Sequence, residues 1–127
     1  EDAHARELGM VIVEVAPGRA VVELTVAPTM TNGYGTAHGG LLFTLADSAF
    51  AFAANTGAED HVAEHASVTF LRPVVVGERL RAEAIERHRR PRAGLFDVAV
   101  TDEAGDVVAE FRGHSRVKPR DDGPATA

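Results

Sequence analysis

The distribution of apolar and polar residues predicts one long helix and six strands. Residues 39–55 are apolar on nearly every side, which is typical of a helix buried in a protein core. Short β-branched or alternating stretches, bounded by Pro, Gly and Asp turns, predict strands before and after this helix. These strands are expected at residues 11–15, 20–27, 66–71, 80–87, 94–101 and 107–116.

The order of these elements predicts an α+β fold. One apolar helix and many strands fit an antiparallel sheet of about five to six strands wrapped around the helix. A single helix leaves the edges and the outer face of such a sheet uncovered, so we expect at least a homodimer. Residues 1–118 are predicted to form a single domain, and residues 119–127 a disordered tail.

Composition excludes several classes of function. The chain has 127 residues and a net charge of −6, which argues against nucleic acid as a partner. It has no cysteine, and its histidines lack metal-ligand spacing, which argues against a metal site. We find no signal peptide and no apolar run of the roughly 18 residues that a membrane span requires. We therefore expect a cytoplasmic protein with no membrane partner.

Asp47 is the unusual residue, because it lies within the most apolar segment of the chain. Stranding its charge in a core would cost several kcal/mol unless it is paired, hydrogen-bonded or protonated. One explanation is structural, with Asp47 bonded to Thr44, to Ser48 or to the backbone. We favour a functional carboxylate. The helical spacing places Gly40, Thr44, Asp47, Ser48 and Ala51 on one face.

Five motifs of the chain are informative in combination. They are Asn-Gly-Tyr-Gly-Thr-Ala-His-Gly-Gly at 32–40, Leu-Phe-Thr-Leu-Ala-Asp at 42–47, Phe-Leu-Arg-Pro at 70–73, Arg-Arg-Pro-Arg at 89–92 and Val-Val-Ala-Glu-Phe-Arg-Gly at 107–113. Together they resemble the hotdog-fold acyl-CoA thioesterases, and in particular their phenylacetic-acid-degradation or PaaI-type branch. They follow the family order over nearly the whole domain. The resemblance implies a hotdog homodimer, usually paired into a homotetramer, with active sites at the dimer interface. It also implies hydrolysis of an acyl-CoA to a carboxylic acid and free CoA, without a metal or redox cofactor.

Thioester hydrolysis needs donors for an oxyanion, and the start of a helix supplies unpaired N–H groups. Gly39 and Gly40 have no side chain to block a carbonyl oxygen there, and in the family the amide matching Gly39 has this role. Asp47 lies roughly 13 Å along the helix from His38, too far to serve the same atom. Either the substrate is long or two subunits contribute, and the family arrangement is the latter. Asp47 acts either as nucleophile or, as we favour, as general base.

The remaining candidates are less tightly defined. His38 either contacts the substrate or only shapes its loop. Asn32 either holds the water or the thioester, as its family counterpart does, or is a turn residue before Gly33. Further candidate substrate-binding residues are Gly40, Phe70, Leu71, Arg72 and Pro73.

The basic cluster Arg89, Arg90 and Arg92 either binds the phosphates of CoA or is a solvated hairpin. The resemblance suggests phenylacetyl-CoA or hydroxyphenylacetyl-CoA as the substrate. Two other readings are a hotdog hydratase acting on acyl thioesters and a non-catalytic acyl-CoA-binding module.

Overall fold

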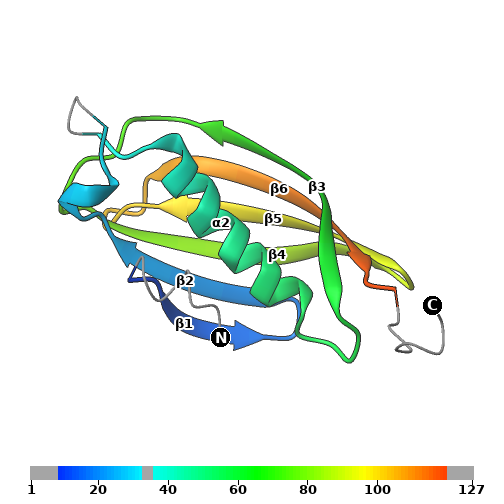
Figure 1. The fold of residues 1–127 in the computed structure, drawn as a ribbon. Coiled ribbons are helices and arrows are strands. Elements are labelled where there is room, and N and C mark those ends of the chain that lie inside the picture. Colours follow the sequence, from blue (N-terminus) through cyan, green and yellow to red (C-terminus); the bar gives the residue numbers. More distant parts are fainter. Residues whose placement is uncertain (1–8, 33–35, 120–127) are drawn as a thin grey trace, which may run out of the picture.

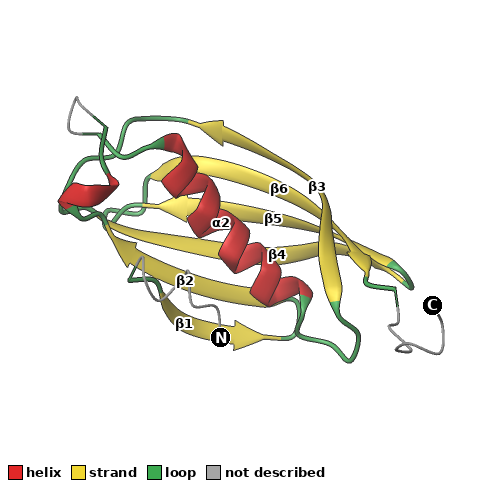
Figure 2. Cartoon of the chain, viewed as in Figure 1, coloured by secondary structure: helices red, strands yellow, loops and turns green. Residues whose placement is uncertain are grey.

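The computed structural model describes residues 9–32 and 36–119 and contains six strands that form one antiparallel sheet around a helix (Figure 1). The elements are β1 Val11–Ala16, β2 Arg19–Thr25, the 3₁₀ turn η1 Pro28–Met30, α2 Gly39–Ala54, β3 His61–Phe70, β4 Arg79–Arg90, β5 Ala93–Thr101 and β6 Val107–Val117. The strand order is β1-β2-β4-β5-β6-β3, with β1 and β3 at the edges. The helix lies across one face of the curved sheet, as Figure 2 shows, so the predicted fold class is confirmed.

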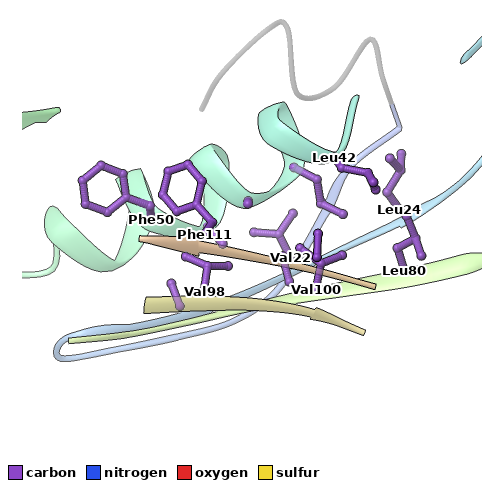
Figure 3. Close-up of a cluster of buried hydrophobic side chains, with 14 of the residues drawn as sticks. Val22, Leu24, Leu42, Phe50, Leu80, Val98, Val100 and Phe111 are labelled. Atoms are coloured by element: carbon purple, nitrogen blue, oxygen red, sulfur yellow. The ribbon is translucent and has the colours of Figure 1, made fainter. Parts of the chain in front are cut away.

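The core lies between α2 and this face of the sheet (Figure 3). The central strands of the sheet contribute apolar residues that face the helix, and these alternate with residues that face outward. Phe50 packs closely on β6, where a Cβ at Gly113 would lie only 2.8 Å from its ring. Glycine at position 113 therefore sets how near the helix can approach the sheet. The helical residues buried in the core are Leu41, Leu42, Leu45, Ala46, Ala49, Phe50, Ala53 and Ala54.

Strand β3 starts at His61, five residues before the predicted strand. Residues 61–65 show no alternation, and the register of β3 against β6 shifts between Ala63 and His65. Asn55, the C-cap of α2, holds the start of this strand through its side chain, which bonds both the N–H and the carbonyl of His61. The early part of β3 thus depends on a contact with the helix rather than on a local pattern.

One stripe of α2 is not covered by its own sheet. The residues predicted to share a face, Gly40, Thr44, Asp47, Ser48 and Ala51, are all exposed or half-buried. The apolar residues of the helix face the sheet instead. Strand β3, the sheet edge, is exposed or half-buried along its whole length. The chain therefore leaves a polar helix stripe and a free strand edge open together.

No helix within the described ranges is long and apolar enough to cross a membrane. The predicted tail lies almost entirely outside the described residues, as do Gly33, Tyr34 and Gly35 of the predicted loop. The domain boundaries therefore stay predictions.

Candidate active site

The start of α2 presents two unpaired backbone N–H groups. The helix begins after His38, whose φ of −62° and ψ of 141° are extended and whose carbonyl accepts the N–H of Leu41 at 2.9 Å. Gly39 and Gly40 follow, both exposed, and their N–H groups have no partner among the described residues. These donors stand at the positive end of the helix dipole, where an oxyanion is stabilised.

A cavity of about 410 Å³ adjoins the first of these donors, Gly39. Its walls combine the helix start with the end of β3 and the segment that follows it, and they include Gly39, Phe70, Leu71, Arg72 and Pro73. A Cβ at Gly39 would lie 3.1 Å from the Phe70 ring, so that ring stands directly over the helix start. The structure therefore brings the predicted oxyanion donor and the predicted substrate-binding segment to one cavity.

Arg72 lines this cavity, but its guanidinium is bound within the chain. It donates to Glu78 at 2.8 Å, to Asp102 at 2.5 Å and to the carbonyl of Pro73 at 2.7 Å. These bonds hold the pKa of both carboxyl groups below their usual values. Arg72 thus fixes the loop that shapes the cavity, and its contact with substrate stays a prediction. Asp102 lies 30 residues away in the sequence, and nothing in the turn around it indicated this contact.

The carboxylate of Asp47 is half-buried and has no hydrogen bond or ion pair among the described residues. Burial raises its pKa above the usual value of an aspartate. The Thr44 hydroxyl donates to the carbonyl of Gly40 at 2.8 Å, and Ser48 makes no bond to Asp47 in this part of the chain. Within the described residues, therefore, no contact of Asp47 supports the structural explanation.

The position of Asp47 on the helix points it toward one side of the sheet. Phe43, one turn before it, packs on Phe111 of β6 with ring centroids 5.4 Å apart, and Phe50, one turn after it, packs on the same ring at 5.7 Å. Residues spaced by three or four share a helix flank, so Asp47 lies on the flank nearest β6 and the free edge β3. Asp47 is also about 12 Å along the helix from Gly39 of its own chain.

Asn32 and His38 flank the loop that precedes the helix. The N–H of Asn32 donates to the carbonyl of Thr36 at 2.8 Å, and the N–H of Thr36 donates to the Asn32 side chain at 3.4 Å. His38 is exposed and makes no side-chain cap bond to the helix. Both residues thus lie at the entrance to the helix start, and their roles toward substrate stay predictions.

The basic cluster lies at the opposite end of α2, beside a second cavity of about 780 Å³. This cavity lies between the β1–β2 turn, the α2–β3 loop and the β4–β5 hairpin, and both Arg89 and Arg90 line it. Arg89 is fixed by an ion pair with Glu86 at 2.8 Å. Arg90 and Arg92 are exposed, and their side chains have no partner among the described residues. The cluster therefore contains one positioned cation and two free ones.

The sequence model of the thioesterase superfamily matches residues 34–109 of this chain. The chain therefore belongs to the thioesterase superfamily, and it is a thioester hydrolase with the hotdog fold. It is 42% identical over 114 residues to acyl-coenzyme A thioesterase PaaI of Escherichia coli strain K12, with 90% of this chain and 81% of the relative covered. These results confirm the resemblance that the motifs indicated.

Two solved structures extend the comparison. That of the E. coli PaaI protein from the phenylacetic acid degradation operon matches with a TM-score of 0.91 and 41% identity, over 93% of this chain and 86% of that chain. The protein smu.793 from Streptococcus mutans UA159, solved with acetyl CoA bound, matches with a TM-score of 0.83 and 27% identity, over 86% and 88%.

Proposed function

We propose that this enzyme hydrolyses an acyl-CoA to a carboxylic acid and free CoA, with Asp47 acting at a site completed by a second subunit. The observation that carries the proposal is the unpaired, half-buried carboxylate of Asp47 on an open helix stripe. Keeping a carboxylate there without a partner opposes stability, as its raised pKa indicates. A role in chemistry explains why the residue is an aspartate.

The proposed reaction uses this geometry. Asp47 accepts a proton from water as the water oxygen attacks the thioester carbonyl carbon. The negative charge that develops on the carbonyl oxygen is received by the N–H of Gly39 of the partner subunit. Collapse of the tetrahedral intermediate breaks the carbon–sulfur bond and releases CoA as its thiolate. Direct attack by Asp47 is the alternative, in which an acyl-aspartyl anhydride forms first and water then hydrolyses it. The reaction requires no metal or other cofactor.

Two subunits are proposed to pair through their β3 edges. The edge is ten residues long and uncovered, and unpaired edges of this length invite association. Apolar side chains stand exposed at both ends of β3, with Val62 at 39% and Phe70 at 49% exposure. Antiparallel pairing about a two-fold axis would bring Asp47 of one chain toward the helix start of the other. The homodimer, and a homotetramer built from it, belong to this proposal.

The second cavity is proposed to receive the phosphates of CoA. Thr56, which lines it, follows Asp47 by nine residues, or roughly 13 Å along the helix direction. The pantetheine arm spans a distance of this order. A thioester held at Asp47 with its pantetheine arm directed toward Thr56 would place its phosphates near Arg89, Arg90 and Arg92, and arginine binds phosphate strongly.

Charge reversal tests this placement. Arg90→Glu combined with Arg92→Glu is expected to raise KM for acyl-CoA about ten-fold or more at low salt and to leave kcat unchanged, because only the phosphates lose their partners. Steady-state kinetics at two ionic strengths measure this. Arg81→Glu is the control for reversal of a single cation, since Arg81 lies toward the other end of β4. An unchanged KM in the double variant would identify these residues as a solvated hairpin.

The proposed acyl group is phenylacetyl or hydroxyphenylacetyl, supported by the likeness to a protein of the phenylacetic acid degradation operon. Free-thiol release from a panel of acyl-CoAs tests it. The arylacetyl-CoAs are expected to give the highest kcat/KM, above acetyl-CoA and straight-chain acyl-CoAs. Faster release from straight-chain acyl-CoAs would overturn the substrate class. Change at the C2–C3 bond would indicate a hydratase, and tight binding without thiol release a binding module. The proposed compartment is the cytoplasm.

A further inference from the structure

Three polar side chains form a connected chain at the wall of the second cavity. The Oγ of Ser115 lies 3.0 Å from Nδ1 of His61, and Nε2 of His61 lies 2.8 Å from Nη1 of Arg89. Ser115 is only 1% exposed, whereas Arg89 reaches the cavity. His61 therefore connects a buried hydroxyl with a cation at the cavity surface.

The main chain of His61 is itself held in place. Asn55 accepts its N–H at 2.7 Å, and the same side chain donates to its carbonyl at 3.3 Å. Asn55 is the C-cap of α2 and also donates to the carbonyl of Ala51 at 2.8 Å. The imidazole is thus fixed at both its backbone and its ring.

The partners of His61 define its tautomer. A guanidinium has only donors, so Nε2 must accept from Arg89 and cannot carry a proton. The ring proton is then on Nδ1, which donates to the Oγ of Ser115. Only neutral His61 satisfies both contacts. A protonated ring would direct an N–H at the N–H groups of Arg89 and break the contact.

A β-bulge directs Arg89 to this place. The register of β4 against β5 shifts between Glu86 and His88, which brings residues 86 and 89 to the same face of the strand. Glu86 accepts from Nε and Nη2 of Arg89, and the guanidinium lies 5.6 Å from the centre of the buried Phe96 ring. One N–H on each terminal nitrogen of Arg89 is left over, so two donors remain for a ligand oxygen.

We propose that His61 is a positioning residue whose neutral ring orients Arg89 toward a phosphate of the acyl-CoA, so that affinity for the substrate falls when His61 becomes protonated. This inference rests on the proposed function, because it requires the CoA phosphates to lie in the second cavity. His61 does not touch the reacting thioester, so kcat is not expected to depend on it.

The charges around His61 set the direction of this dependence. Burial and the adjacent Arg89 on β4 lower its pKa, while Glu59 on the α2–β3 loop and Glu86 on β4 act in the opposite direction. The net effect is a pKa below the ordinary value for histidine, so the ring is neutral at pH 7 and above. The KM for acyl-CoA is therefore constant at neutral pH and rises as the pH falls through the lowered pKa.

Two substitutions of His61 separate positioning from titration. Gln in place of His61 keeps an acceptor near the position of Nε2 but does not titrate, so His61→Gln should keep the neutral-pH KM and lose the rise in acid. Asn is too short to reach Arg89, so His61→Asn should raise KM about 3- to 10-fold at pH 8 with kcat unchanged. His114→Gln, on an exposed position of β6, is the control and should match the wild type at every pH.

The comparison must also account for the phosphate, which takes up a proton in the same pH range. Its protonation acts equally in the wild type and in His61→Gln, so the difference between their pH profiles reports His61 alone. Identical profiles in these two proteins would overturn the proposal. So would an unchanged KM in His61→Asn together with a raised KM in the Arg90 and Arg92 double variant, because the phosphates would then bind without help from His61.

A truncated substrate makes failure of the proposed function recognisable. An acyl-N-acetylcysteamine thioester has no phosphate, so its hydrolysis should be the same in the wild type, His61→Asn and His61→Gln. If His61→Asn slows this substrate as much as acyl-CoA, His61 acts on the fold or on the catalytic groups, and the inference is wrong. If KM for acyl-CoA changes in none of the cavity variants while both substrates are hydrolysed, the phosphates lie elsewhere, which contradicts the inference and the proposed placement of CoA but not the hydrolysis.

Discussion

Asp47→Asn is expected to lower kcat by about 10²–10⁴-fold with little change in KM. The amide has nearly the same shape as the carboxylate, but it can neither take a proton from water nor attack the thioester. No hydrogen bond or ion pair of Asp47 is lost in the described chain, so the packing of α2 stays intact. Free-thiol release from acyl-CoA measures kcat, and Ser48→Ala, on the same helix stripe, is the matched control. Normal turnover in Asp47→Asn would refute the catalytic assignment.

The pH dependence of stability tests the role of Asp47 independently of its activity. The pKa of Asp47 is raised in the folded state, so the folded protein favours the protonated carboxyl. The free energy of unfolding of the wild type therefore decreases as the pH rises from the ordinary pKa of aspartate through the raised value. Asparagine cannot lose a proton, so Asp47→Asn should have a higher Tm than the wild type at pH 7. The difference should vanish below the ordinary pKa of aspartate. A loss of activity with a gain of stability is characteristic of a functional residue.

The elements of the fold were predictable because they depend on local patterns. The alternation in β5 and β6 and the apolar length of α2 reveal which faces are buried, whatever the rest of the chain does. The first half of β3 was not predictable, since residues 61–65 do not alternate and are held by Asn55 beyond the helix end. The pairing of residues 61–65 with β6 joins residues more than 40 positions apart, and no short window of sequence can indicate such a pairing.

The candidate site likewise contains residues that the sequence reveals and contacts that it does not. Asp47 and Gly39 stand out in the sequence because a carboxylate in an apolar run and glycines at a helix start are locally unusual. The contact of Arg89 with His61 joins residues 28 positions apart, and that of His61 with Ser115 joins residues 54 positions apart. Such contacts depend on strand order and on a bulge in β4. The sequence indicates which groups have the chemistry for a functional site, and the fold determines which of these groups come into contact.

Gly39 allows the removal of a single backbone N–H with little other change. It is the first residue of α2, a position that suits proline because φ there is already helical. The preceding residue, His38, has the extended conformation that proline requires of its neighbour, with φ −62° and ψ 141°. Gly39→Pro therefore deletes the proposed oxyanion donor while the helix retains its start.

Gly39→Pro is expected to lower kcat by about 10²–10³-fold. Gly39→Ala is the control, since it places the same Cβ near Phe70, 3.1 Å away, but keeps the N–H. The alanine variant should lose much less activity, because the Phe70 ring has only to move by a few tenths of an ångström. Equal losses in the two variants would show that crowding of Phe70, not the missing donor, is responsible.

Mixing the two inactive variants tests whether each site spans two subunits. A heterodimer of Asp47→Asn with Gly39→Pro has one site in which Asp47 of the proline chain meets the Gly39 N–H of the asparagine chain, and its other site lacks both groups. Random pairing after co-expression makes half of the dimers heterodimers, so about one quarter of wild-type activity should return. If each chain instead supplied both groups to its own site, every site in the mixture would lack one of them. No activity would then return, because Gly39 and Asp47 would be serving the same subunit despite their separation along the helix.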